Sequence, residues 1–186
     1  MINNIMFTHI RYNLVVVSII YLASVSTTFA QKGNEYQVKA AFLYNLARMV
    51  EWPSDGLVRA NIPVTFCFFG EDFFGNTLDS IKNKTVKNRP LFLKKNVSLM
   101  ELGQCDLLFI SRSESRRLPS ILAYVEKLPV LTVGDTNGFA EQGGMVNLMT
   151  QGSRIQIEVN LRATKEVGLK ISSRLLTLAD IVEGNS

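Results

Sequence analysis

From residue 36 onward, the hydrophobic and polar positions of the chain switch repeatedly between a helical and a strand-like spacing. Apolar side chains cover most of the helical circumference over Tyr36–Trp52 and leave a narrow polar stripe. This pattern predicts a helix, ended by Pro53, that is packed on two sides or offers one apolar side to a partner. The next elements expected from the apolar runs are a strand over Ile62–Phe69, a helix from about Asp72 to Ile81, strands over Pro90–Val97 and Asp106–Ser111, a helix from Ser113 to about Lys127, and a strand over Pro129–Val133.

The C-terminal part of the chain changes to a pair of adjacent strands. Met145–Thr150 and Arg154–Asn160 flank Gln151-Gly152-Ser153, a tight-turn sequence that predicts an antiparallel hairpin. Apolar and polar residues alternate strictly over Arg154–Asn160, so this strand is expected to have one wet face and to lie near the edge of the sheet. A last helix is expected to begin at Ser172 or Ser173 and to extend to Val182.

Together these elements predict an α/β fold of three layers, in which helices flank a mainly parallel sheet and a C-terminal antiparallel hairpin is added to it. Strands that alternate with helices favour parallel pairing, because the intervening helix returns the chain to the same edge. The sequence has no internal repeat and no linker-like segment. Residues 31–186 are therefore expected to form a single domain.

The first thirty residues have the pattern of a cleaved signal peptide. Arg11 precedes the apolar run Leu14–Ala23, and small residues at Thr28 and Ala30 fit signal peptidase cleavage before Gln31. The alternative is an uncleaved membrane anchor, but ten strongly apolar residues cover only about half of the roughly 30 Å hydrocarbon core. The segment therefore predicts export to the periplasm.

Composition excludes several classes of function. The only histidine, His9, lies in the predicted signal peptide, so the mature chain has none, which excludes Ser-His-Asp and Cys-His catalysis and histidine-ligated zinc. The net charge of +4 is not gathered into runs, so nucleic-acid binding is not expected. No nucleotide-binding glycine motif is present and no cofactor is expected. The chain is therefore interpreted as a protein that is not an enzyme.

Two cysteines, Cys67 and Cys105, complete the chemically informative residues. In an oxidising compartment two cysteines favour a structural disulfide, and the alternative is a reactive or redox-sensing pair. A metal site is not expected, because two thiolates without histidine leave a soft cation short of ligands.

Polar residues follow three of the expected parallel strands. Asp72, Arg112 and Asp135 lie where the carboxyl ends of the strands meet, and open α/β sheets bind ligands at this edge. One interpretation is a small crevice in which the two carboxylates accept hydrogen bonds and Arg112 contacts an anion. The alternative is structural, with Asp72 capping a helix and Asp135 starting a turn.

Five segments resemble the YfiR-like family of bacterial periplasmic proteins. They are Tyr36–Pro53 (YQVKAAFLYNLARMVEWP), Phe69–Gly75 (FGEDFFG), Leu107–Ser111 (LLFIS), Leu131–Leu148 (LTVGDTNGFAEQGGMVNL) and Ile155–Ala179 (IQIEVNLRATKEVGLKISSRLLTLA). The resemblance implies a non-enzymatic periplasmic regulator that binds the periplasmic sensor domain of an inner-membrane diguanylate cyclase and keeps the cyclase inactive. Less cyclic-di-GMP and less biofilm are the expected result. It also implies disulfide-dependent folding, with Cys67 and Cys105 where such a bridge is expected.

A surface for such a partner is expected on the spare apolar sides of the first and last helices, because large exposed apolar patches mark interaction sites. A competing envelope protein and a homodimer are further partner hypotheses. The alternative function is a periplasmic small-ligand sensor or solute-binding module that feeds a membrane receptor or kinase. The residues expected on the partner surface are Phe42, Met49, Trp52, Leu175, Leu178 and Val182.

Overall fold

A sheet of eight strands organises the chain, in the spatial order β10-β8-β7-β6-β5-β2-β4-β3. The structure is a computed structural model that describes residues 35–53, 62–152 and 154–184. It divides into the units Met1–Tyr36 and Gln37–Ser186, and the fold described here is that of the second unit. The predicted signal peptide, residues 1–30, lies outside the described residues. Among the described helices, none is long and apolar enough to cross a membrane.

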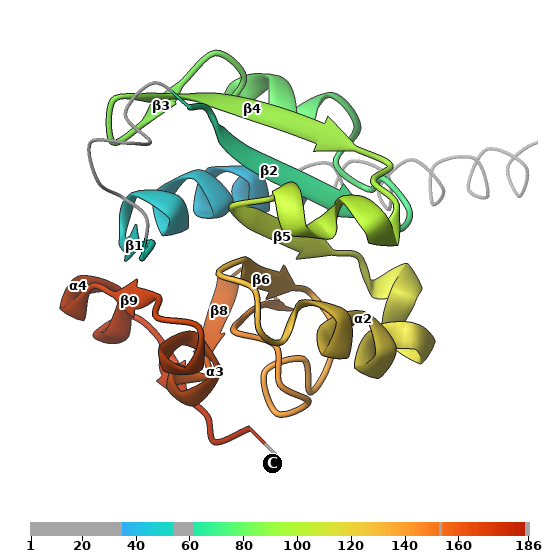
Figure 1. Cartoon of the computed structure of the whole chain (residues 1–186), viewed down its shortest axis with the longest axis vertical. Helices are drawn as coiled ribbons and strands as arrows, with labels where there is room; N and C mark the ends of the chain where they lie inside the picture. The colour runs from blue at the N-terminus through green and yellow to red at the C-terminus, as the bar shows by residue number, and fades with distance from the viewer. Residues whose placement is uncertain (1–34, 54–61, 153, 185–186) are drawn as a thin grey trace, which may run out of the picture. The chain divides into compact units, whose positions relative to one another are not determined.

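Parallel pairing dominates the sheet. Five neighbouring pairs are parallel, and only the β7–β8 hairpin and the β3–β4 pair are antiparallel. Figure 1 shows β4, β2, β5 and β6 following one another from the top of the view downwards. The predicted α/β fold with its C-terminal hairpin is therefore confirmed. The strands are β2 (Val64–Phe69), β3 (Thr85–Val86), β4 (Arg89–Lys95), β5 (Leu107–Ile110), β6 (Leu131–Gly134), β7 (Val146–Gln151), β8 (Arg154–Val159) and β10 (Asp180–Ile181).

Helices cover both faces of this sheet. On one face, α2 (Leu118–Val125) and the 3-10 helix η3 (Leu99–Gln104) pack on Leu108 and Ile110 of β5. Phe109, between them in sequence, points to the opposite face and meets the ring of Phe74 at 4.9 Å. The helix over residues 35–48 buries Ala40, Leu43, Leu46 and Ala47. The other helices are η2 (Gly75–Ser80), η4 (Arg112–Arg117), α3 (Leu161–Glu166) and α4 (Ser173–Leu176).

The first helix ends earlier than its apolar pattern predicts. It stops at residue 48, and β1 (Val50–Glu51) pairs antiparallel with β9 (Lys170–Ile171) in a second, two-stranded sheet. Trp52 is turned into the interior, where its indole N–H donates to the carbonyl of Asp106 at 3.0 Å. Strand pairing and this buried hydrogen bond end the helix, so the predicted extension to Trp52 is wrong.

Three further expected helices differ from their predicted form. The one expected from Asp72 is the 3-10 helix η2, and the one expected from Ser113 begins as the 3-10 helix η4, whose N-cap is Ser111. At the C-terminus, Ser172 caps α4 as predicted, but α4 has only four residues. Asp180 and Ile181 then pair with β8, and this pairing replaces the helix expected to reach Val182.

Phe139 fixes the loop between β6 and β7. Its ring is fully buried and lies against two glycines, Gly134 and Gly144. A Cβ at Gly134 would lie 2.3 Å from the ring, and a Cβ at Gly144 would lie 2.1 Å from it. Both positions therefore require glycine for steric reasons.

Candidate functional site

Asp135 lies at the carboxyl end of β6, but its carboxylate is not open to a ligand. Lys39 of the first helix donates to its Oδ2 at 2.8 Å, and the backbone N–H of Arg112 donates to its Oδ1 at 3.1 Å. The Asp135 side chain is 0% exposed and that of Lys39 is 2% exposed. The carboxylate therefore joins the first helix to the ends of β5 and β6.

Asp72 is held in the same way by its own chain. Its Oδ1 accepts hydrogen bonds from the backbone N–H groups of Phe74 and Gly75, and its Oδ2 pairs with Lys95 at 2.9 Å. Burial raises the pKa of Asp72, but the hydrogen bonds from Lys95 and the two N–H groups outweigh it, and the pKa lies below its usual value. Asp72 thus binds the backbone just before η2, whose N-cap is Phe74 and not Asp72.

Arg112 is exposed, and its guanidinium lies 5.0 Å from the ring centre of Phe73. Its backbone N–H donates to Asp135 Oδ1. The structure thus brings the ends of β2, β5 and β6 together, but it turns the three predicted side chains to partners within the chain.

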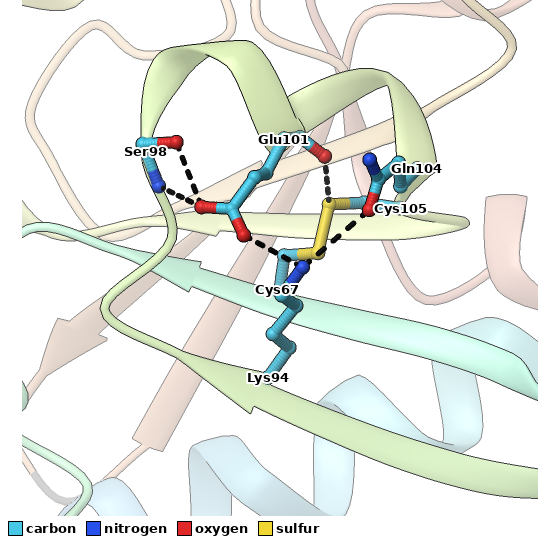
Figure 2. Close-up of polar contacts among 6 residues, drawn as sticks. All are labelled: Cys67, Lys94, Ser98, Glu101, Gln104 and Cys105. Atoms are coloured by element: carbon cyan, nitrogen blue, oxygen red, sulfur yellow. Dashed lines mark hydrogen bonds and ion pairs between the residues drawn. A yellow bond between two sulfur atoms is a disulfide. The ribbon is translucent and has the colours of Figure 1, made fainter.

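The two cysteines form a disulfide. Cys67 lies in β2, and Cys105 is the C-cap of η3, directly before β5. Both are buried, and among the described residues there is no free cysteine. Figure 2 shows the bridge fastening η3 to the sheet, with the Cys105 Sγ 3.5 Å from the carbonyl oxygen of Glu101. The predicted pairing of these residues is therefore present in the structure.

A polar cluster next to the disulfide fixes the other end of η3. The N–H and the hydroxyl of Ser98 both donate to Glu101 Oε2 at 2.7 Å, and Lys94 of β4 pairs with Glu101 Oε1 at 2.8 Å (Figure 2). The Lys94 ammonium, and then the two Ser98 groups, lower the pKa of Glu101 to about 2. The Ser-x-x-Glu spacing is a helix-start signal that the sequence analysis missed.

The residues expected on the partner surface differ in how far they are exposed. Trp52 is only 4% exposed and Leu175 is fully buried, so neither contributes to a surface. Phe42, Met49 and Val182 are half-buried. Leu178, at 65% exposed, is the most accessible residue of the predicted set.

Two clefts adjoin α3. One, of about 480 Å³, is lined by α2, by α3 and by residues between them, including Thr132, Met145 and Asn160. The other, of about 340 Å³, is lined by Leu161, Arg162 and residues 181–184. Neither cleft is lined by Asp72, Arg112 or Asp135. In the described part of the chain, no group of three His, Cys, Asp or Glu residues is placed to hold a metal ion.

Comparisons with known proteins give one family match. A family profile described as YfiR/HmsC-like matches residues 36–180. No curated protein matches the chain. Among solved structures, a conserved domain protein of Vibrio cholerae is similar at 9% identity and a TM-score of 0.47, over 67% of this chain and 57% of that one. The ABC domain of a Streptococcus pneumoniae protein in complex with L-Trp is similar at 14% identity and a TM-score of 0.47, over 68% of this chain and 58% of that one. The chain thus covers less than two thirds of either solved protein.

Proposed function

Because this chain belongs to the YfiR/HmsC-like family, we propose that it is a periplasmic regulatory protein that represses an inner-membrane diguanylate cyclase. It binds the periplasmic sensor domain of the cyclase and so lowers cyclic-di-GMP and biofilm formation. The observation that carries this proposal is the family match, which extends over residues 36–180. The structure supports it through the three features described next.

The buried disulfide supports a location outside the cytoplasm. Structural disulfides persist in oxidising compartments such as the periplasm, whereas cytosolic thiols are kept reduced. The Cys67–Cys105 bridge is buried and has no free cysteine beside it in the described chain, which fits a permanent structural bond. The signal-like residues 1–30 point to the same compartment.

The state of the carboxylates supports a role without catalysis. Asp72 and Asp135, the acids that a hydrolase at the strand ends would need, are each held by a lysine and by backbone N–H groups. General acid–base catalysis needs a group that can reach a substrate proton. Such held carboxylates instead stabilise the fold, so the chain acts by binding.

The C-terminal surface supports binding of a protein partner. Leu178 and Ile181 are 65% and 49% exposed, and Ile181 and Val182 line the cleft of about 340 Å³ beside α3. Exposed apolar groups next to a concavity are typical of protein contacts. We define Leu178, Ile181 and Val182 as the C-terminal patch and assign it to the cyclase sensor domain.

Repression follows from a difference in affinity. A protein that binds only the inactive state of the cyclase shifts the cyclase toward that state by its differential affinity for the two states. A competing envelope protein that binds the C-terminal patch removes the repressor and releases the cyclase. No change in the repressor's own fold is needed.

Deletion and complementation in the source bacterium test this function. Deleting the gene is expected to raise cyclic-di-GMP, and the wild-type gene is expected to restore the original level. Leu178→Asp should fail to restore it while the protein is still exported and folded. The matched control is Tyr124→Asp, since Tyr124 is also exposed, at 49%, but lies on α2. Unchanged cyclic-di-GMP in the deletion strain would overturn the proposal.

The cleft between α2 and α3 favours a second candidate, a small-ligand sensor. Its volume of about 480 Å³ falls in the usual range of small-molecule sites. A ligand that binds only the folded state stabilises it by RT ln(1 + [L]/Kd) and so raises the melting temperature as its concentration increases. A thermal-shift screen of small metabolites should therefore find a stabilising compound if this candidate is right, and Thr132→Val, on the cleft wall, should weaken its effect.

A further inference from the structure

The cleft between α2 and α3 has an apolar interior. Leu122 and Val125 of α2 line one side of it, Ala163 of α3 lines another, and Met145 lines it from the position just before β7. Leu122, Val125 and Met145 are all buried, so the fold fixes their side chains. We call this space, of about 480 Å³, the α2–α3 cleft. Its size and its lining suit the apolar body of a small molecule.

Three charged side chains line the α2–α3 cleft, and two of them are carboxylates. They are Glu126, Arg162 and Glu166. Arg162 is already used within the chain, because its Nη2 donates to the carbonyl of Gly184 at 2.9 Å and its Nε lies 3.7 Å from Glu166 Oε1. The Glu126 carboxylate forms no ion pair or hydrogen bond with another described residue. The cleft is therefore left with one carboxylate that no cation of the described chain balances.

Glu126 also occupies an unfavourable position on its helix. It is the C-cap of α2, and the last turn of α2 holds no basic residue. The C-terminal end of a helix carries partial negative charge, so a carboxylate there adds to the negative potential and a cation relieves it. Lys127 follows directly in the sequence, but it does not line the cleft. A cation beside Glu126 is therefore attracted both by the carboxylate and by the helix end.

The groups that would attract an anion to the cleft are occupied. A helix N-terminus attracts anions through its N–H groups, and the N-terminus of α3 adjoins the cleft. Its Ala163 N–H, however, donates to Oδ1 of the capping residue Asn160 at 3.0 Å. The side-chain amide of Gln142 donates to the carbonyl of Gly138 at 3.0 Å. Since Arg162 is also used, the cleft favours a ligand that donates hydrogen bonds over one that accepts them.

We propose that the α2–α3 cleft binds a small organic amine with an apolar body. The ammonium group donates to Glu126 at the end of α2, and the body packs on Leu122 and Met145. Hydrogen bonds between charged groups are stronger than neutral ones. An amino acid fits less well, because its carboxylate would meet two glutamates and an Arg162 that is already used. The inference rests on the small-ligand candidate proposed above and does not depend on the cyclase.

Three probes with the same ring test the charge preference. They are phenethylamine, 2-phenylethanol and phenylacetate, and their Kd values are measured by NMR titration of the purified, oxidised protein without the cyclase. The amine is expected to bind about tenfold more tightly than the alcohol, and the acid is expected to bind most weakly. Equal Kd values for the amine and the alcohol, or no binding of the amine at about 10 mM, would overturn the proposal. Tightest binding of the acid would keep the small-ligand candidate and reject the amine.

The variant Glu126→Gln tests the residue. It keeps the shape of the side chain and removes its charge, so the Kd of phenethylamine should rise about tenfold while that of 2-phenylethanol stays the same. Asp79→Asn is the matched control, because Asp79 is an exposed acid of η2 that does not line the cleft. Without ligand, E126Q should melt no lower than wild type, since it removes a carboxylate from the unfavourable helix end. A lower melting temperature, or an equal loss of amine affinity in both variants, would contradict the role of Glu126.

Methyl NMR of the methionines locates the bound amine. Met145 lines the cleft and is 4% exposed, whereas Met100 of η3 is 85% exposed and does not line it. Titration with phenethylamine should shift the methyl signal of Met145 until the site is saturated, because the ring lies against it, and should leave the signal of Met100 unchanged. Met145→Leu assigns the signal. Binding without a shift at Met145 would place the amine outside the cleft and overturn the proposal.

Discussion

The Nζ of Lys39 lies 2.8 Å from Oδ2 of Asp135, with both side chains buried and 96 residues apart in sequence. Removing one partner of a buried ion pair leaves the other charge unpaired, which costs about 3–5 kcal/mol. Lys39→Met is therefore expected to lower the free energy of unfolding by this amount in urea denaturation. The control is Glu166→Gln, which breaks the exposed pair with Arg162 and should cost less than about 1 kcal/mol. Equal losses in the two variants would show that burial is not the deciding factor.

The disulfide closes a loop between residues 38 positions apart. In the chain-entropy model, a loop of this length stabilises the folded state by about 4 kcal/mol. The double variant Cys67→Ser with Cys105→Ser should lose about this much stability in denaturant, and it leaves no thiol behind. Reduced wild type should unfold at the same midpoint as the double variant. If a reductant leaves wild type unchanged while thiol titration shows complete reduction, the stabilising role is wrong.

Glu101 makes stability depend on acid pH. Its pKa is about 2 in the folded protein, below the ordinary value of 4.5. The carboxylate therefore contributes stability above about pH 4.5, and this contribution is lost as the pH falls from 4.5 through 2. The stability difference between wild type and Glu101→Gln should be constant near neutral pH and shrink over this window. A carboxyl midpoint above 4 in an NMR titration of Glu101 would contradict the arrangement in Figure 2.

Gly144 is required by the ring of Phe139. A Cβ at residue 144 would lie 2.1 Å from that ring, so Gly144→Ala should cost about 1–3 kcal/mol through overpacking. Gly103→Ala is the control, because its Cβ would meet Leu128 at an ordinary 3.5 Å. In a background of Phe139→Ala, the same change at Gly144 should cost much less, and a thermal-unfolding cycle of the four proteins measures this coupling. Additive losses would show that the ring is not the cause.

The sheet could be predicted from the sequence because its central strands are short apolar runs. β5 is buried on both faces and is the clearest example. The two-residue strands β1, β9 and β10 could not be predicted, since so short a pairing depends on which segments the fold brings together and not on local pattern. The first and last helices are shorter than predicted for the same reason, because residues expected in them pair as β1 and β10 instead.

For the candidate site, residue types could be predicted but their partners could not. Asp72 and Asp135 lie at the ends of strands, as the predicted order of strands and helices indicated. Their lysine partners, Lys95 and Lys39, are 23 and 96 residues away, and no spacing rule connects them. An acid at a strand end has the same sequence signal whether it binds a ligand or a lysine of its own chain. The disulfide was predictable because two cysteines allow a single pairing within the chain.

In the export proposed above, the position of the bridge would also order the events of folding. Cys105 lies two residues before the start of β5 at Leu107, so in an exported chain the bond could form once Cys105 has emerged, before β6, β7 and β8 have emerged. The disulfide would then keep the start of β5 next to β2, its partner on one side. The other side of β5 would remain free to pair with β6. The two cysteines would then be oxidised before the C-terminal strands have emerged. The disulfide would hold the first part of the sheet together while the later strands are added to it.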